Sequence, residues 1–229
     1  MITLFKDFVS LLFPDLCGVC QNPLYSNENV LCLKCLYELP EVTNINGESQ
    51  QLLSQLQGHS KLEHILSPFI YSSKGILSSP MHSLKYKGNQ LMGIYLGELL
   101  GSFLMNQPPF SQTTLIIPTP LHPSKLRSRG FNQSSLIARG VASKLKVPLR
   151  EDILIRELAT ESQTLKNKWE RESSPSGHFR VANENLYGQN ILIIDDIITT
   201  GATISACAKA FDSIENIRLF AASVAYTKK

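Results

Sequence analysis

Apolar runs without alternation mark the strands that we expect in this chain. The clearest are TLIIPT (114–119), ILIID (191–195) and IRLFAASVAY (217–226), and further strands are expected at 68–73 and near 147–155. Such runs are typical of strands that are covered on both faces. Because helical patterns lie between them, the sequence predicts an α/β fold with a mostly parallel sheet and helices on each side.

The helical patterns have recognisable starts. Ser79 and Pro80 fit an N-cap and a first-turn proline, and they open a short helix that ends at Gly88. Longer helices are expected near 90–105, 132–146 and 202–212. Along the first of these, small residues recur every four positions and allow another helix or the sheet to approach closely: Gly93, Gly97 and Gly101.

The N-terminal part of the chain has a different character. Residues 41–62 are polar, with apolar residues thinly spread, which indicates a linker with or without a single helical turn. We therefore expect three parts: a small module at 1–42, a linker at 43–66 and the α/β domain at 67–229. At 229 residues and 43% apolar content, the chain is large enough for a buried core.

Four of the five cysteines form two pairs, Cys17-x2-Cys20 and Cys32-x2-Cys35. Two such knuckles supply the tetrahedral sulfur shell that zinc prefers, and a complete shell of four thiolates predicts a structural zinc ion rather than a catalytic one. The alternative is a pair of disulfides or a redox CxxC motif. Cys207 stands apart in a helical stretch and is interpreted as a small buried side chain.

The net charge of +3 hides an asymmetry. Between Glu98 and Glu151 the chain has no acidic residue, so this window favours an anionic partner. Its later part carries seven basic residues: Lys125, Arg127, Arg129, Arg139, Lys144, Lys146 and Arg150.

The sequence does not suggest insertion into a membrane. No uncharged apolar stretch approaches the roughly 18 residues that a membrane helix needs. The apolar N-terminus is interrupted by Lys6 and Asp7 and ends at Pro14, which does not fit a signal peptide. We therefore expect a cytoplasmic protein, in which thiols stay reduced.

The stretch ILIIDDIITTGAT (191–203) carries the most specific chemistry. Asp195 and Asp196 end an apolar strand, and buried carboxylates need donors, water or a metal. The turn that follows, Thr199, Thr200, Gly201, Ala202 and Thr203, enters a helix, so it offers backbone N–H groups and hydroxyls to an anion. Acceptors for sugar hydroxyls beside donors for a phosphate predict a ribose 5-phosphate site. The alternative is a solvated acidic turn.

This stretch resembles the phosphoribosyl pyrophosphate (PRPP) signature of type I phosphoribosyltransferases. The resemblance implies that Asp195 and Asp196 face the ribose hydroxyls, that residues 199–203 hold the 5-phosphate, and that the sheet is of that transferase kind. In an active enzyme the two acids would lie near the positive charge that develops on the ribose.

Three further segments resemble the ComF family of competence proteins: the cysteine pairs, HSLKYKG (82–88) and IPTPLHPSKLRSRGFNQS (117–134). The resemblance implies that His122, Lys125, Arg127 and Arg129 meet the pyrophosphate, with which Mg²⁺ arrives. The alternative is a solvated basic loop. A loop that covers the site is implied at 160–181, but the family's Arg-x-x-Asn is represented only by Arg171 with Ser173 or Ser174.

Two functions follow from the resemblance. The first is a PRPP-binding, phosphoribosyltransferase-like protein of natural competence that handles incoming single-stranded DNA in the cytoplasm, with a competence helicase and recombination mediator proteins as partners. The alternative is an active phosphoribosyltransferase of nucleotide or base salvage that transfers ribose 5-phosphate from PRPP to a nitrogen acceptor.

Overall fold

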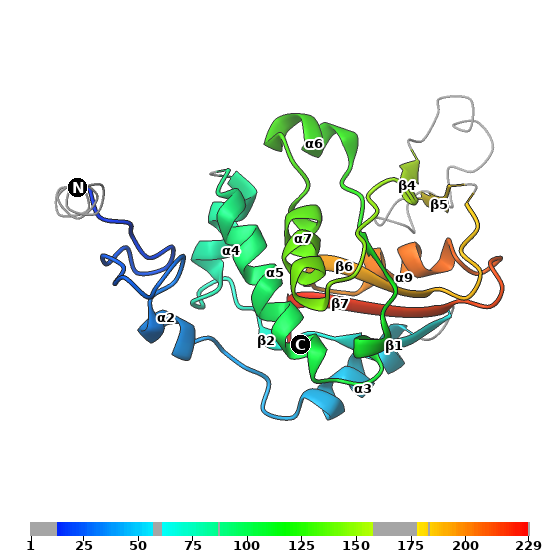
Figure 1. The fold of residues 1–229 in the computed structure, drawn as a ribbon, viewed down its shortest axis with the longest axis horizontal. Coiled ribbons are helices and arrows are strands. Elements are labelled where there is room, and N and C mark those ends of the chain that lie inside the picture. Colours follow the sequence, from blue (N-terminus) through cyan, green and yellow to red (C-terminus); the bar gives the residue numbers. More distant parts are fainter. Residues whose placement is uncertain (1–12, 57–60, 87, 158–177, 183, 229) are drawn as a thin grey trace.

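The fold is built around a parallel sheet (Figure 1). The structure is a computed structural model and describes residues 13–56, 61–86, 88–157, 178–182 and 184–228. Four strands follow one another in the order β1 (Leu62–Leu66), β7 (Arg218–Tyr226), β6 (Asn190–Ile198) and β3 (Leu115–Pro118), and a fifth, β2 (Phe69–Ile70), pairs with the end of β7. These pairings are all parallel, which confirms the expected fold class.

Alternate side chains of the strands enter two different cores. Ile116, Leu192 and Phe220 pack with helices α5 (Gln90–Met105) and α7 (Gln133–Leu145) on one face. Their neighbours Ile117, Ile193 and Ala221 pack on the other face with α3 (Ile45–Leu56) and α9 (Ala202–Lys209). Because both faces are covered, the strands can be continuously apolar, as their sequences are.

Helices α5 and α7 approach each other through glycine. A methyl group on Gly97 of α5 would collide with the carbonyl oxygen of Ile137, and one on Gly140 of α7 would collide with that of Ile94. The prediction of close packing along this face of α5 is therefore confirmed. Helix α4 (Ser78–Tyr86) precedes α5, and the 3-10 turn η1 (Phe110–Gln112) leads from α5 into β3.

The segment expected as a linker is more structured than its composition suggested. It contains the twelve-residue helix α3 and strand β1, which pairs with β7. Leu52 and Leu56 are one helical turn apart and buried against the sheet, and the partly buried Leu53 packs beside them, so a few apolar residues anchor a mostly polar helix. The domain boundaries at 42 and 67 stay predictions.

The single strand expected near 147–155 is not observed in that form. Only Leu149 bridges to β3, through Ile116, while β4 (Leu154–Glu157) pairs antiparallel with β5 (His178–Val181) in a separate two-stranded sheet. Between these two contacts the chain carries charge at the surface, where Arg150 forms ion pairs with Asp152 and Glu184.

The cysteine module packs onto the α/β part. It includes the short helix α2 (Leu33–Tyr37), and its buried residues Leu31 and Leu39 belong to the same core as α5. Gly18 lies so close to the Met92 side chain that a Cβ atom there would collide with it. Among the described residues, no helix combines the length and the apolar character needed to cross a bilayer.

Candidate functional site

Asp195 lies buried at the carboxyl end of β6, with 8% of its surface exposed. Its Oδ1 accepts hydrogen bonds from Thr119 Oγ1 at 2.7 Å, from Ser134 Oγ at 3.1 Å and from the Asp196 amide at 2.9 Å. Burial, followed by the charge of Asp196, raises the pKa of Asp195 to about 6, against the lowering effect of these hydrogen bonds. The carboxylate is thus fixed in one orientation before any ligand binds.

Asp196 has a different environment. Its Oδ2 lies 2.8 Å from Lys85 Nζ, and both side chains are mostly covered. Its Oδ1 accepts from the Ile197 amide at 2.7 Å. Lys85 comes from the last turn of α4, so a helix outside the strand motif supplies the cation that pairs with Asp196.

The turn after β6 surrounds a small hollow with Asp195 at its edge. Residues 199–203 line it together with Ile197, Ile198 and Ile204. Gly201, the N-cap of α9, has a φ of 76°, a left-handed conformation that glycine adopts without strain. The first amides of α9 therefore begin at the hollow, where the positive end of the helix favours an anion. The structure brings Asp195 and this turn together, as the sequence predicted.

The basic segment after Pro118 is a helix, α6 (Pro123–Arg129), where we expected a loop. Helix formation is explained by its first residues, because His122 Nδ1 accepts from the Ser124 amide at 3.2 Å and Pro123 takes the first helical position. His122 is thus an N-cap, and Arg127 is exposed. None of the described contacts joins either residue to the acids.

The other two basic residues predicted for the pyrophosphate do reach the neighbourhood of Asp196. Lys125 and Arg129 line a pocket of about 350 Å³ together with Lys85, Gly88 and Ser128. Lys85 is shared between this pocket and the ion pair with Asp196. The site therefore has a continuous path from carboxylates to cations, which suits a ligand that carries both hydroxyls and an anion.

Three residues of this site were not predicted from the sequence: Lys85, Thr119 and Ser134. All three lie inside segments that carry the ComF resemblance, HSLKYKG and IPTPLHPSKLRSRGFNQS. Their positions next to the acids depend on how α4, β3 and α7 pack, and that packing is not visible in the segments themselves. Residues 160–177 of the expected covering loop lie outside the described residues.

The four cysteines of the module form a second candidate site. Their Sγ atoms all lie within 4.8 Å of one another, with Cys20 and Cys32 at 3.7 Å, and all the thiols are free. A tetrahedral zinc ion with Zn–S bonds of about 2.3 Å would place its sulfur ligands roughly 3.8 Å apart. The arrangement fits a metal site of this type.

Cys17 has the environment of a metal-binding thiolate. Burial opposes its ionisation, but the backbone amides of Cys32, Cys20 and Val19 donate to its sulfur and bring its pKa to about 6. A pKa below 7 favours the thiolate, which is the form that binds metal.

Comparison with curated proteins finds relatives named for competence and DNA use, although no family model matches the chain. The chain is 29% identical to competence protein ComFC of Bacillus subtilis over 61% of its own length and 55% of that protein, so it spans about half of that relative. It is 25% identical to competence protein F of Haemophilus influenzae, with 84% of this chain and 89% of that protein covered. DNA utilization protein YhgH of Salmonella typhi is 24% identical, with 87% and 91% covered.

Among solved structures, the chain is similar to the allosteric regulatory enzyme of purine biosynthesis (TM-score 0.40, 14% identity, 61% of this chain and 29% of that one). It is also similar to adenine phosphoribosyltransferase from Leishmania donovani (TM-score 0.33, 15% identity, 62% and 68%). The competence-protein relatives confirm the resemblance to the ComF family that is seen in the motifs.

Proposed function

We propose that this chain binds PRPP at the carboxyl edge of its sheet and acts in natural competence, where it handles incoming single-stranded DNA in the cytoplasm. The observation that carries the proposal is the arrangement at the end of β6. A buried, oriented Asp195 adjoins Asp196 on one side and a threonine-rich turn at a helix N-terminus on the other.

Each part of the site suits one part of PRPP. Asp195 and Asp196 would accept hydrogen bonds from the ribose hydroxyls, while residues 199–203 would donate to the 5-phosphate. Lys85, Lys125 and Arg129 would face the pyrophosphate. Mg²⁺ would arrive with the pyrophosphate and neutralise part of its charge.

The same geometry supports the alternative of an active transferase. With the pyrophosphate held by cations and the ribose held by carboxylates, Asp195 and Asp196 would lie near positive charge as the bond to the leaving group breaks. Release of pyrophosphate from PRPP only in the presence of a nitrogen acceptor would support the transferase. PRPP binding without turnover would support a binding protein.

The four-cysteine module would hold a structural zinc ion. A closed shell of four thiolates has no open position for a substrate, so its contribution would be to the stability of residues 15–40. Single-stranded DNA would contact the basic window, and the competence helicase and recombination mediators are the partners that the family resemblance suggests.

The test is replacement of both acids, Asp195→Asn with Asp196→Asn. We expect loss of PRPP binding by calorimetry and loss of transformation, with DNA binding retained. Asp212→Asn is the matched control, because Asp212 is exposed beyond the end of α9. Retained PRPP affinity in the double variant would refute the site, and unchanged transformation would remove the PRPP site from the biological role.

A further inference from the structure

A second cavity, of about 450 Å³, lies beside α6 and apart from the acids. Its walls come from the β3–α6 connection, from α6 itself and from the first turns of α5 and α7, with Glu151 at one side. It shares no lining residue with the hollow at 197–204 or with the Lys85 pocket. Its volume is in the range typical of small-molecule sites. The proposed PRPP site leaves it without a role.

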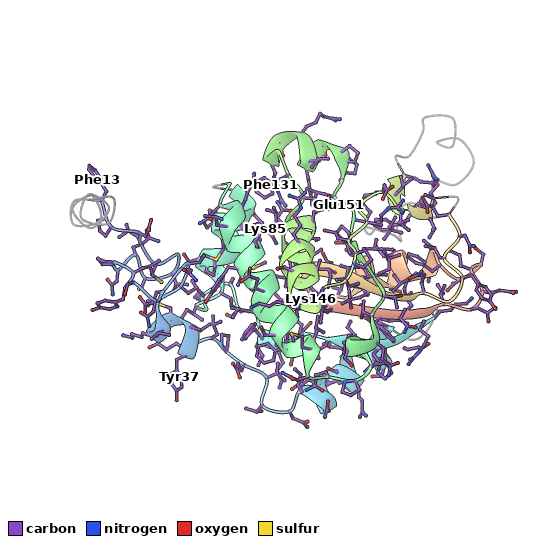
Figure 2. The ribbon with its side chains drawn as sticks, viewed as in Figure 1. Phe13, Tyr37, Lys85, Phe131, Lys146 and Glu151 are labelled. Atoms are coloured by element: carbon purple, nitrogen blue, oxygen red, sulfur yellow. The ribbon has the colours of Figure 1, made fainter. Side chains whose placement is uncertain are left out.

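The cavity walls are about half apolar and include one aromatic ring. Leu121, Leu126 and Phe131 contribute side chains, together with Pro118 and Pro120. Leu126 is 43% exposed, so the cavity opens to solvent along α6. Figure 2 shows Phe131 and Glu151 near the end of α7 that lies below α6. A flat ring in the wall of a partly apolar cavity is a surface on which a planar group can stack.

The polar groups of the cavity carry no net charge. Arg139 Nη2 and Glu151 Oε1 are 3.0 Å apart and neutralise each other at the rim. Ser135, which also lines the cavity, is only 4% exposed. Gln90 and Asn132 also line the cavity. Donors and acceptors without net charge suit a neutral group that has both kinds of polar atom.

Two further cations, which do not line the cavity, lie close to it on α6. Lys125 and Arg127 are exposed on α6, which forms one wall, and the chain has no acid between Glu98 and Glu151. A neutral, partly aromatic cavity next to exposed cations matches the two components of a single nucleic-acid strand, its uncharged bases and its phosphates.

We propose that this cavity holds a nucleobase of single-stranded DNA, stacked on Phe131, while the neighbouring phosphates lie along α6. The proposal rests on the DNA-handling part of the proposed function and places it on one face of the molecule. The base and the PRPP site would then lie on opposite sides of the α7 N-terminus, where Ser134 faces Asp195 and the next residue, Ser135, faces the cavity.

The experiment compares two fluorescent strands of equal length and charge, an oligo-dT and an abasic strand. For the wild-type chain we expect the oligo-dT to bind at least tenfold more tightly. Phe131→Ala should lower the oligo-dT affinity to the abasic level and leave the affinities for the abasic strand and PRPP unchanged. If Phe131→Ala unfolds, Leu126→Gln, which makes the exposed wall of the cavity polar, should lower the oligo-dT affinity in the same way. Tyr187→Ala is the control, because Tyr187 is an exposed aromatic residue outside the cavity.

Four outcomes would overturn the proposal. Equal wild-type affinity for the two strands would exclude a base site, and a preference for oligo-dT that survives in both cavity variants would place the base elsewhere. Failure of the wild type to bind either strand would remove the DNA part of the proposed function and this cavity's role with it. If free thymidine displaced oligo-dT at concentrations as low as those at which oligo-dT itself binds, the cavity would be a site for a free nucleoside instead.

Discussion

Asp195 carries its charge where little water reaches it, and that should be measurable as a dependence of stability on pH. Its pKa is about 6 in the folded chain against an ordinary 3.8. Because the folded state holds the proton more tightly, the folded state binds more protons between about pH 4 and 6. Stability therefore falls as pH rises through this window and stays lower above it.

Asp195→Asn should remove this slope. At pH 7.5 we expect the variant to be as stable as the wild type or more stable, by about 1–3 kcal/mol, because a shift of two pKa units corresponds to roughly that energy. Chemical denaturation at pH 4, 5, 6 and 7.5 checks the prediction, with Asp212→Asn as control. If Asp195→Asn were clearly less stable at pH 7.5, its hydrogen bonds with Thr119 and Ser134 would matter more than the cost of the buried charge.

Lys85 is the residue that joins the acid side of the site to its cationic side. Lys85→Met keeps much of the side-chain volume but leaves Asp196 without its cation, so the polyanion PRPP would meet an uncompensated carboxylate. We expect PRPP affinity to fall by about tenfold or more, which corresponds to roughly 1.4 kcal/mol.

Lys85→Arg should retain most of the affinity because it keeps the charge. Calorimetric titration with PRPP and Mg²⁺ measures the effect, and Lys209→Met is the control on the exposed end of α9. A loss of affinity in Lys85→Arg as large as that in Lys85→Met would show that the shape of the side chain, rather than its charge, is required.

Helix α6 offers a way to separate two roles of His122, which precedes it. The structure makes it an N-cap, whereas the family resemblance implies contact with pyrophosphate. His122→Ala should cost about 1 kcal/mol of stability, and His122→Asn should cost little because asparagine is a good N-cap. Thermal unfolding and PRPP titration check both variants. If His122→Asn lost PRPP affinity more than tenfold with its stability intact, His122 would contact the ligand.

The elements that sequence patterns located correctly are those whose apolar residues form unbroken or helical runs. Strands β3, β6 and β7 and helices α5 and α7 are of this kind. Helix α3 and strand β1 were missed because a few leucines anchor them, and tertiary contacts rather than periodicity decide their structure. The acids and the threonine-rich turn were found because they are contiguous, whereas Thr119 reaches Asp195 across 76 positions of sequence.

For the whole molecule, the cysteine module and the α/β part share one core. Cys17, Cys32 and Cys35 are buried in the cluster that also contains Met92 and Leu96 of α5. A short segment cannot supply enough buried surface to fold alone, so a metal ion would hold it in shape against α5. Loss of the metal should therefore lower the stability of the α/β part as well as that of the module.

We expect a strong chelator, or Cys35→Ser, to lower the melting temperature of the entire chain in a single transition. Native mass spectrometry should find one zinc ion per chain before chelation and none after it, and added zinc should restore the wild type but not the variant. Cys207→Ala controls for loss of a buried thiol outside the cluster. If removal of the metal changed only the surroundings of Tyr25 and Tyr37 and left the melting temperature of the main unfolding transition unchanged, the module would unfold independently. The shared core would then contribute little to the stability of the α/β part.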